Sequence, residues 1–337
     1  MNGCAAIFGC SGPGISPSER AFFREAAPWG FILFARNCEN PAQIRRLVSE
    51  LQDILGREAP VLIDQEGGRV ARLKPPHWRC YPPARRYGEL YAADPADGLE
   101  AARLGGLLIG AELAALGINV DCLPVLDVPA PGAHDIIGDR AYAADPAVVA
   151  ALGRAAAEGL MAARVLPVIK HVPGHGRAGA DSHENLPIVA TCADELRRTD
   201  FAPFKALADL PMAMTAHVIY QAFDAERPAT ISPVMVGDII RGEIGFNGLL
   251  MTDDLSMKAL QGSLEARTEA SFDAGCDVVL HCNGELAEMS AIAKAARPLS
   301  GAAARRAQAV ENLFGPADPF DEAEALARFS ALTGTGL

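Results

Sequence analysis

Eight short apolar runs, separated by amphipathic segments, recur along almost the whole chain. They occupy residues 4–9, 31–35, 60–64, 118–127, 166–170, 211–216, 248–252 and 277–281. Little polar alternation interrupts their Val, Ile, Leu and Met residues, which is typical of parallel strands buried on both faces. Strand–helix alternation repeated eight times predicts an α/β fold, a closed (β/α)8 barrel of the TIM type. The rival is an open doubly wound sheet, but no G-x-G-x-x-G motif follows the first run.

The segments between the runs carry signals for the start of a helix. Ser16-Pro17-Ser18-Glu19 forms a capping box with proline at the first helical position. The same order of a capping side chain followed by proline recurs at Asn40, Asp94, Asp145 and Ser232. These signals support helices between the predicted strands.

Chain length and connections favour one domain. The 337 residues suit one barrel of roughly 250 residues with insertions. Two connections, 66–93 and 129–145, are long, and loops of such length usually build a site. No linker is evident. We therefore expect a single catalytic barrel domain over residues 1–337, with a helical C-terminal segment from about residue 284.

Composition excludes several classes of partner. The net charge of −12 disfavours nucleic acid, and no apolar run approaches the ~20 residues that cross a bilayer. The start, Met1-Asn2-Gly3-Cys4, lacks the basic region of a secretory signal. The eight cysteines form no C-x2-C pair, which fits a reducing, cytoplasmic setting. We expect no metal, no cofactor, no membrane contact and no obligate protein partner.

Six consecutive runs end in ionisable side chains. In a (β/α)8 barrel the active site lies at the carboxyl ends of the strands, so these groups would share one rim. A single aspartate after a strand is usually a helix cap, but six such ends together predict an active site. The groups are Asp64 with Glu66, Asp127, Lys170 with His171, His217, Asp253 with Asp254, and His281.

The segment after the fifth run combines glycines with a carboxylate and an imidazole. Gly174, Gly176 and Gly179 allow the chain to bend. Asp181 and His183 are two residues apart, so the carboxylate can orient the imidazole and stabilise its charge. A histidine with a pKa of roughly 6.5 suits proton transfer near neutral pH. The alternative is an ordinary polar loop.

Asp253 and Asp254 close the seventh run. Adjacent residues of an extended chain point in opposite directions, so we expect only one of the two carboxylates to face the pocket. The spacing does not decide which one.

Six stretches of the chain resemble the β-N-acetylhexosaminidases of glycoside hydrolase family 3, in particular the short, single-domain bacterial members that act on cell-wall fragments. The resemblance runs from about residue 5 to residue 290. Its motifs are Ile63-Asp64-Gln65-Glu66-Gly67-Gly68-Arg69-Val70-Ala71-Arg72, Ile137-Gly138-Asp139-Arg140, Lys170-His171-Val172-Pro173-Gly174-His175-Gly176, Asp181-Ser182-His183, Ala216-His217-Val218-Ile219-Tyr220 and Thr252-Asp253-Asp254-Leu255-Ser256-Met257. Val172 and Thr252 depart from the Phe and Ser common there.

The resemblance implies a retaining exo-β-N-acetylglucosaminidase that acts on small carbohydrates, in particular peptidoglycan fragments (muropeptides). It assigns the nucleophile to Asp253 and the general acid/base to His183, with Asp181 as its partner. Residues expected to bind the non-reducing-end sugar are Asp64, Arg72, Arg140, Lys170 and His171.

Three other functions remain open at this stage. Lys170 at a strand end could serve a Schiff-base enzyme. His171, His175 and His183 with an aspartate could hold a catalytic metal. A non-catalytic sugar-binding protein would use the same binding residues but would not need Asp253 or Asp181.

Overall fold

The structure describes residues 3–132, 134–179, 186–317 and 319–335. In this computed structural model, eight parallel strands close into a barrel in the order β1-β10-β9-β7-β5-β4-β3-β2. The predicted (β/α)8 barrel is confirmed, and each strand coincides with one of the eight apolar runs. The strands are β1 (Ala6–Gly9), β2 (Gly30–Leu33), β3 (Val61–Ile63), β4 (Val120–Asp121), β5 (Leu166–Val172), β7 (Met212–Thr215), β9 (Leu249–Asp254) and β10 (Val278–His281).

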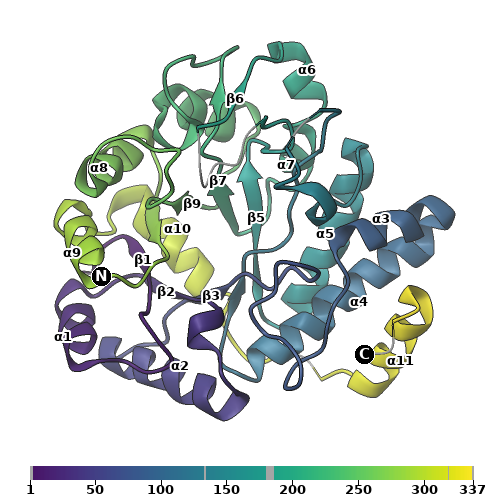
Figure 1. Cartoon of the computed structure of the whole chain (residues 1–337), viewed down its shortest axis with the longest axis horizontal. Coiled ribbons are helices and arrows are strands. Elements are labelled where there is room, and N and C mark those ends of the chain that lie inside the picture. Colours follow the sequence, from purple (N-terminus) through teal and green to yellow (C-terminus); the bar gives the residue numbers. More distant parts are fainter. Residues whose placement is uncertain (1–2, 133, 180–185, 318, 336–337) are drawn as a thin grey trace.

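Helices surround the barrel (Figure 1). They are α1 (Pro17–Ala26), α2 (Pro41–Leu55), α3 (Ala84–Ala93), α4 (Pro95–Ala114), α5 (Pro146–Ala162), α6 (Ala193–Arg198), α7 (Ala202–Ala206), α8 (Leu264–Ala274), α9 (Leu286–Ala295), α10 (Gly301–Glu311) and α11 (Glu322–Thr333). Three short 3-10 helices are η1 (Ala35–Asn37), η2 (Gly138–Arg140) and η3 (Ala229–Ile231). The element η4 (Val234–Glu243) is a π-helix. Within the described ranges, no helix has the length and apolar character needed to cross a membrane.

Four of the five predicted helix starts agree with the observed caps, whereas η4 after Ser232 is a π-helix whose N-cap is Pro233. Ser16 and Glu19 form the reciprocal capping box at the start of α1. The side chains of Asn40, Asp94 and Asp145 accept backbone N–H groups of the first turns of α2, α4 and α5. Each cap satisfies donors that the helix itself leaves unpaired.

Three features of the fold differ from the expectation. Strand β4 is shorter than the run 118–127: its regular pairing ends at Asp121 and contact with β5 resumes as an isolated bridge between Val125 and Lys170, beyond Pro124, which has no N–H to donate. The last ten residues of the connection 66–93 form helix α3. A separate two-stranded parallel sheet pairs β6 (Ile188–Val189) with β8 (Ile219–Tyr220), and two-residue strands are too short to show a period in the sequence.

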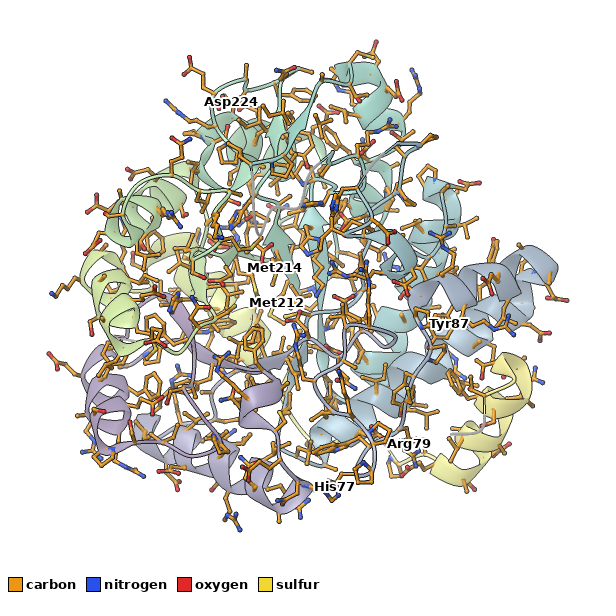
Figure 2. All side chains as sticks on the ribbon, viewed as in Figure 1. His77, Arg79, Tyr87, Met212, Met214 and Asp224 are labelled. Atoms are coloured by element: carbon orange, nitrogen blue, oxygen red, sulfur yellow. The ribbon has the colours of Figure 1, made fainter. Side chains whose placement is uncertain are left out.

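The barrel interior is packed rather than open. Met212 and Met214 of β7 are buried near the centre of the molecule, whereas His77, Arg79 and Asp224 lie at its periphery (Figure 2). Buried apolar side chains from all eight strands belong to one continuous core. This core holds the strand ends in fixed positions around the rim.

The C-terminal helix α11 packs on α4 beside the loop that follows β3. Its buried Phe329 lies with its ring centroid 6.1 Å from that of Tyr81 and 6.3 Å from that of Tyr87. The loop 67–83 and helix α3 are therefore held from outside by the end of the chain.

Glycine permits the close contact between α4 and α5. A Cβ atom on Gly159 would lie 2.0 Å from the carbonyl oxygen of Arg103 and 2.7 Å from the backbone nitrogen of Leu107. Both obstacles are backbone atoms of a packed helix, so neither can move easily.

Gly159→Ala should therefore lower the free energy of unfolding by about 1–3 kcal/mol through overpacking. Gly237→Ala in η4 is the matched control, since no atom lies within 4 Å of its added Cβ. That control should be neutral or stabilising by up to about 1 kcal/mol, because alanine restricts the unfolded chain. Urea unfolding of both variants tests the difference, and a Gly159→Ala protein as stable as wild type would contradict it.

Candidate active site

A cavity of about 470 Å³ opens at the carboxyl ends of the barrel strands. It brings together all six predicted site residues that belong to the described part of the chain, namely Asp64, Arg72, Arg140, Lys170, His171 and Asp253. The other two predicted residues, Asp181 and His183, lie outside the described residues.

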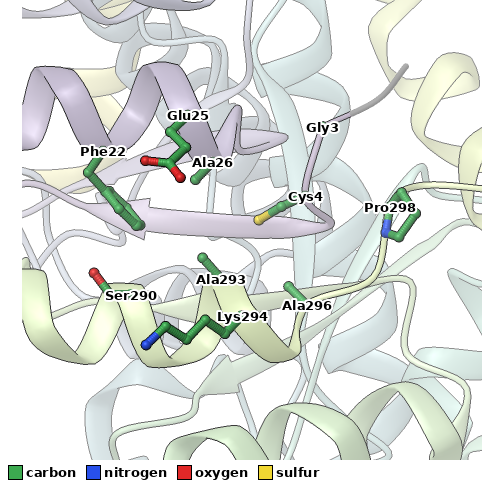
Figure 3. Close-up of a pocket in the computed structure, with 10 residues that line it drawn as sticks. All are labelled: Gly3, Cys4, Phe22, Glu25, Ala26, Ser290, Ala293, Lys294, Ala296 and Pro298. Atoms are coloured by element: carbon green, nitrogen blue, oxygen red, sulfur yellow. The ribbon is translucent and has the colours of Figure 1, made fainter.

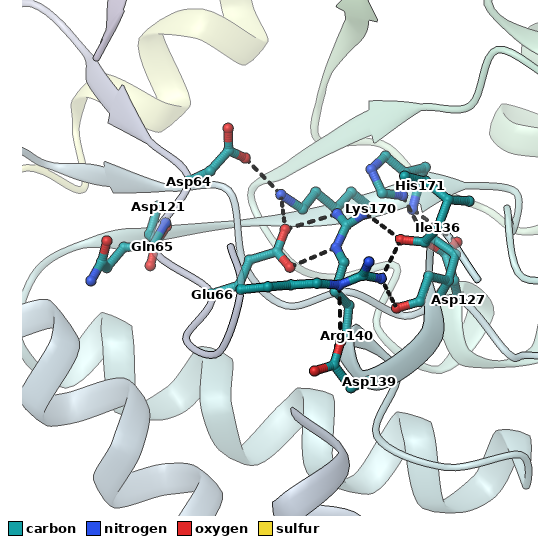
Figure 4. Close-up of polar contacts among 12 residues, drawn as sticks. Asp64, Gln65, Glu66, Asp121, Asp127, Ile136, Asp139, Arg140, Lys170 and His171 are labelled. Atoms are coloured by element: carbon teal, nitrogen blue, oxygen red, sulfur yellow. Dashed lines mark hydrogen bonds and ion pairs between the residues drawn. The ribbon is translucent and has the colours of Figure 1, made fainter. Parts of the chain in front are cut away.

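Lys170 of β5 is the buried centre of the polar network (Figure 4). Its Nζ lies 2.7 Å from Oδ1 of Asp64 and 2.6 Å from Oε1 of Glu66, and its side chain is 2% exposed. Burial alone would lower the pKa of Lys170, but the two carboxylates outweigh burial and raise it. The amine therefore stays protonated, which is the opposite of what a Schiff-base nucleophile requires.

Two arginines complete the network around these carboxylates. Arg140 donates to Glu66 through both Nε (2.8 Å) and Nη2 (2.9 Å), the two-pronged geometry in which arginine binds carboxylates most firmly. Arg72 donates from Nη2 to Oδ2 of Asp64 at 3.0 Å. Arg140 thus pairs with Glu66, and the neighbouring Asp139 pairs with Arg69.

The network also fixes the charge of both carboxylates. Burial would raise the pKa of Glu66, but the charges of Arg140 and Lys170 lower it to about 2. The pKa of Asp64 likewise lies well below its usual range, because Lys170 and Arg72 outweigh its burial. Both groups are therefore ionised at neutral pH.

Asp127 orients the ring of His171, which lies at the rim beside Lys170. Its Oδ2 lies 2.7 Å from Nδ1 of His171, and its Oδ1 accepts the backbone N–H groups of His171 (3.1 Å) and His175 (2.6 Å). Although burial opposes ionisation, the nearby His171 helps to lower the pKa of Asp127 to about 2. With Nδ1 held by this carboxylate, Nε2 is the ring nitrogen of His171 left to meet a ligand.

Both residues at the end of β9, Asp253 and Asp254, belong to the lining of the cavity, and their carboxylates have different partners. The chain turns directly after Asp254. Asp254 accepts Ser256 Oγ at 2.6 Å and the backbone N–H groups of Ser256 (3.0 Å) and Cys282 (3.3 Å). Its two oxygens thus hold the turn together, whereas Asp253 accepts the N–H of Asp254 through Oδ1.

His217, which follows β7, holds the end of β9 through a hydrogen bond. Its Nε2 lies 3.0 Å from the carbonyl oxygen of Asp254, and its Nδ1 lies 2.7 Å from Oγ1 of Thr230. A carbonyl can only accept, so Nε2 donates to Asp254. In a neutral ring Nδ1 then accepts from the Thr230 hydroxyl, which also lies 3.1 Å from the carbonyl oxygen of Ala216. Burial lowers the pKa of His217, consistent with this neutral ring.

The chain on either side of Asp181 and His183 is firmly anchored. Gly176 must be glycine, since a Cβ there would lie 2.0 Å from the carbonyl oxygen of Val128. The Tyr220 hydroxyl donates to the carbonyl oxygen of Gly174 at 2.6 Å, and the same tyrosine belongs to β8, which pairs with β6. Gly174, before residues 180–185, and strand β6, after them, therefore both contact the segment that contains Tyr220, at the rim that carries His171.

The sequence placed Glu66 at the rim without giving it a role in binding, and it gave no signal for Phe34 or Arg36. Glu66 stands two positions after Asp64, so a shared orientation on extended chain was a signal for it. Phe34 and Arg36 follow β2, whose end carried no ionisable group within the apolar run, and they line the cavity as well.

A second, larger cavity of about 570 Å³ lies between α1 and α9 (Figure 3). It is lined by small residues with Phe22, Cys4, Glu25 and Lys294, and it lacks the converging charges of the rim. Within the described ranges, no three His, Cys, Asp or Glu side chains lie together in a way that could hold a metal ion. The chemistry is therefore assigned to the cavity at the strand ends.

Comparisons with known proteins agree with this geometry. A model of the glycosyl hydrolase family 3 N terminal domain matches residues 20–314. A β-hexosaminidase of Bordetella avium is 38% identical over 277 residues, 81% of this chain and 79% of the relative, and one of Methylococcus capsulatus is 41% identical over 281 residues, 82% of each chain. The crystal structure of NagZ from Neisseria gonorrhoeae in complex with N-trifluoroacetyl-D-glucosamine superposes with a TM-score of 0.87 at 29% identity, over 99% of this chain and 98% of that one.

The barrel and the charged cavity at its rim, together with these relatives, define a glycoside hydrolase. More specifically, the chain belongs to glycosyl hydrolase family 3.

The buried network predicts the stability of Glu66→Gln. Removing this carboxylate leaves Arg140 and Lys170 short of counter-charge, which should lower the free energy of unfolding by about 3–5 kcal/mol at neutral pH. The pKa of Glu66 is depressed in the folded state to about 2, so its contribution is complete above the ordinary glutamate pKa of roughly 4.3 and is lost as the pH falls toward 2.

The gap in stability between wild type and Glu66→Gln should therefore shrink as the pH falls from about 5 to about 2. Denaturant unfolding across that range measures it. Glu89→Gln is the control, because its pair with Arg86 lies on exposed surface and should matter little at any pH. A gap independent of pH would contradict the assignment.

Proposed function

We propose that the protein is a retaining exo-β-N-acetylglucosaminidase that removes terminal, non-reducing N-acetylglucosamine. The observation that supports this proposal is the cavity that Asp253 lines together with the paired charges of Asp64, Arg72, Arg140 and Lys170. Relatives that are themselves β-hexosaminidases, and one solved with a derivative of glucosamine, support the choice of sugar.

The binding residues would hold a neutral sugar through its hydroxyl and acetamide groups. Asp64 offers acceptors, while Arg72, Arg140 and Lys170 offer donors, and His171 adds one ring nitrogen. Because the ion pairs already fix these side chains, little rotamer freedom is lost when the sugar binds. A small pocket with several fixed donors and acceptors suits a single terminal ring.

In the proposed mechanism Asp253 attacks the anomeric carbon as the bond to the aglycone breaks. His183 gives its proton to the departing oxygen, with Asp181 stabilising the imidazolium. The glycosyl-enzyme is then attacked by water, whose proton His183 takes, and the Asp253 carboxylate is released. Two inversions at the same carbon retain the β configuration.

Asp253 is preferred to Asp254 as the nucleophile because the Asp254 carboxylate already has a structural task. Both oxygens of Asp254 accept hydrogen bonds that shape the turn after β9. Moving that carboxylate onto a sugar would break this turn. His217, by holding the carbonyl of Asp254, would keep the neighbouring Asp253 in place.

We further propose peptidoglycan fragments as the natural substrate and the cytoplasm as the compartment. The eight cysteines, all present as thiols, fit a reducing compartment. A non-catalytic sugar-binding protein would not need the reactive carboxylate, and turnover of a chromogenic N-acetylglucosaminide separates the two functions. Loss of activity after exhaustive chelation would favour a metal-dependent reaction instead.

A fluorinated N-acetylglucosaminide that forms the intermediate faster than it hydrolyses should label Asp253. Mass spectrometry of the digested protein should find the added sugar on the peptide that contains this residue, and Asp253→Asn should take up none. Label on Asp254 would overturn the assignment. Absence of any label would favour the alternative in which the substrate's own acetamide is the nucleophile.

His183→Ala should lose about 10²–10⁴ in kcat/KM on substrates with poor leaving groups, since general acid help is worth that much. The loss should be smaller with a 4-nitrophenyl glycoside, whose phenolate leaves without a proton. His77→Ala, an exposed histidine at the periphery, is the control and should leave both rates near wild type. Equal losses on the two substrates would argue against the role of His183.

A further inference from the structure

Arg36 is an exposed arginine at the lip of the active-site cavity, directly after β2. Its Nε donates to the carbonyl oxygen of Cys10 at 2.8 Å, and its Nη2 donates to the carbonyl oxygen of Cys282. The guanidinium carbon also lies 5.1 Å from the ring centroid of Phe34. Two carbonyls and an aromatic ring therefore hold this cation in one orientation.

The other cations of the cavity differ from Arg36 because each already has a carboxylate. Arg72 and Lys170 pair with Asp64, and Arg140 pairs with Glu66. At the rim, Nε of Arg69 lies 3.0 Å from Oδ1 of Asp139. Throughout the described part of the chain, Arg36 makes no ion pair. An oriented cation at a ligand cavity that lacks a protein counter-charge is suited to receive one from the ligand.

The position of Arg36 indicates which part of the ligand it would meet. Phe34 lies between it and the sugar-binding set, since Arg72 stands 5.0 Å from the same ring centroid. Cys282 connects it to the nucleophile strand, because this residue accepts from Arg36 and donates to Asp254. Arg36 therefore lies across Phe34 from Arg72 and next to the end of β9, which carries Asp253. If Asp64 and Arg72 hold the terminal sugar, this is the side of the cavity on which the aglycone would lie.

We propose that Arg36 is a specificity residue that binds a carboxylate on the aglycone, so that the enzyme prefers acidic aglycones to neutral ones. The inference rests on the proposed N-acetylglucosaminidase function and names a feature of its substrate. The outer Nη1 and the edge of the guanidinium supply the donors, while the carbonyls of Cys10 and Cys282 keep the group from turning away. Arg36 touches no reacting atom, so it acts on selectivity and not on the chemical step.

The carboxylate could come from two parts of a peptidoglycan fragment, and three substrates distinguish them. All three carry N-acetylglucosamine on anhydro-N-acetylmuramic acid. The first has a free lactyl carboxylate, the second has that group as a neutral methyl amide, and the third has carboxylates only in a peptide attached there. The measured quantity is kcat/KM for each acidic substrate divided by kcat/KM for the neutral amide, because this ratio does not depend on how much of a variant is folded.

Wild type should favour one or both acidic substrates by about tenfold, the expected size of a charge-assisted hydrogen bond at a partly exposed site. Arg36→Gln should bring the ratio close to one, and Arg36→Lys should keep part of it. Arg69→Gln is the control, since that rim arginine is already paired, and it should retain the wild-type ratio. Added salt should weaken the preference of wild type but not that of Arg36→Gln.

The two acidic substrates assign the source of the carboxylate, since the ratio that falls on Arg36→Gln identifies it as lactyl or peptide. Unchanged ratios in Arg36→Gln for both acidic substrates, or a wild type with no acidic preference, would overturn the inference. Failure of the proposed function has a different signature, because wild type would then release no N-acetylglucosamine even from the neutral amide. Thermal unfolding of each variant shows whether the bonds to Cys10 and Cys282 also matter for stability.

Discussion

The buried ammonium of Lys170, held between the carboxylates of Asp64 and Glu66, is the interaction on which the site depends. A charge removed from water is costly unless opposite charges and hydrogen bonds compensate it. Here the compensation comes from the loop after β3 and is shared with Arg72 and Arg140. Because these charges satisfy one another, the strand ends that carry them are fixed before any ligand arrives.

The same principle divides the carboxylates of the cavity by role. Asp64 and Asp254, whose oxygens each accept from protein donors, shape the pocket and the turn after β9. Asp127 fixes the ring orientation of His171, and His217 holds the end of β9. Around a sugar, such fixed dipoles and charges need no rearrangement as the reaction proceeds, which is the usual source of catalysis by preorganisation.

Much of the fold could be predicted because local sequence encodes it. The eight apolar runs became the eight strands, and the side chains at Ser16 and Asn40 became caps. The failures have equally local causes. The regular pairing of β4 ends at Asp121, ahead of Pro124, and a helix without a side-chain cap, α3, was hidden in a long connection whose Pro83 gives no hydrogen-bonding signal.

By itself the sequence determined the periodicity of strands and helices, the helix starts, and the kinds of ionisable groups delivered to the rim. Only the tertiary structure decided which of those groups meet. Lys170 and Asp64 are 106 residues apart, and Arg140 and Glu66 are 74 apart. Their pairing depends on the register in which β3, β4 and β5 close the barrel, and registry between distant strands leaves no trace in the local pattern of either one.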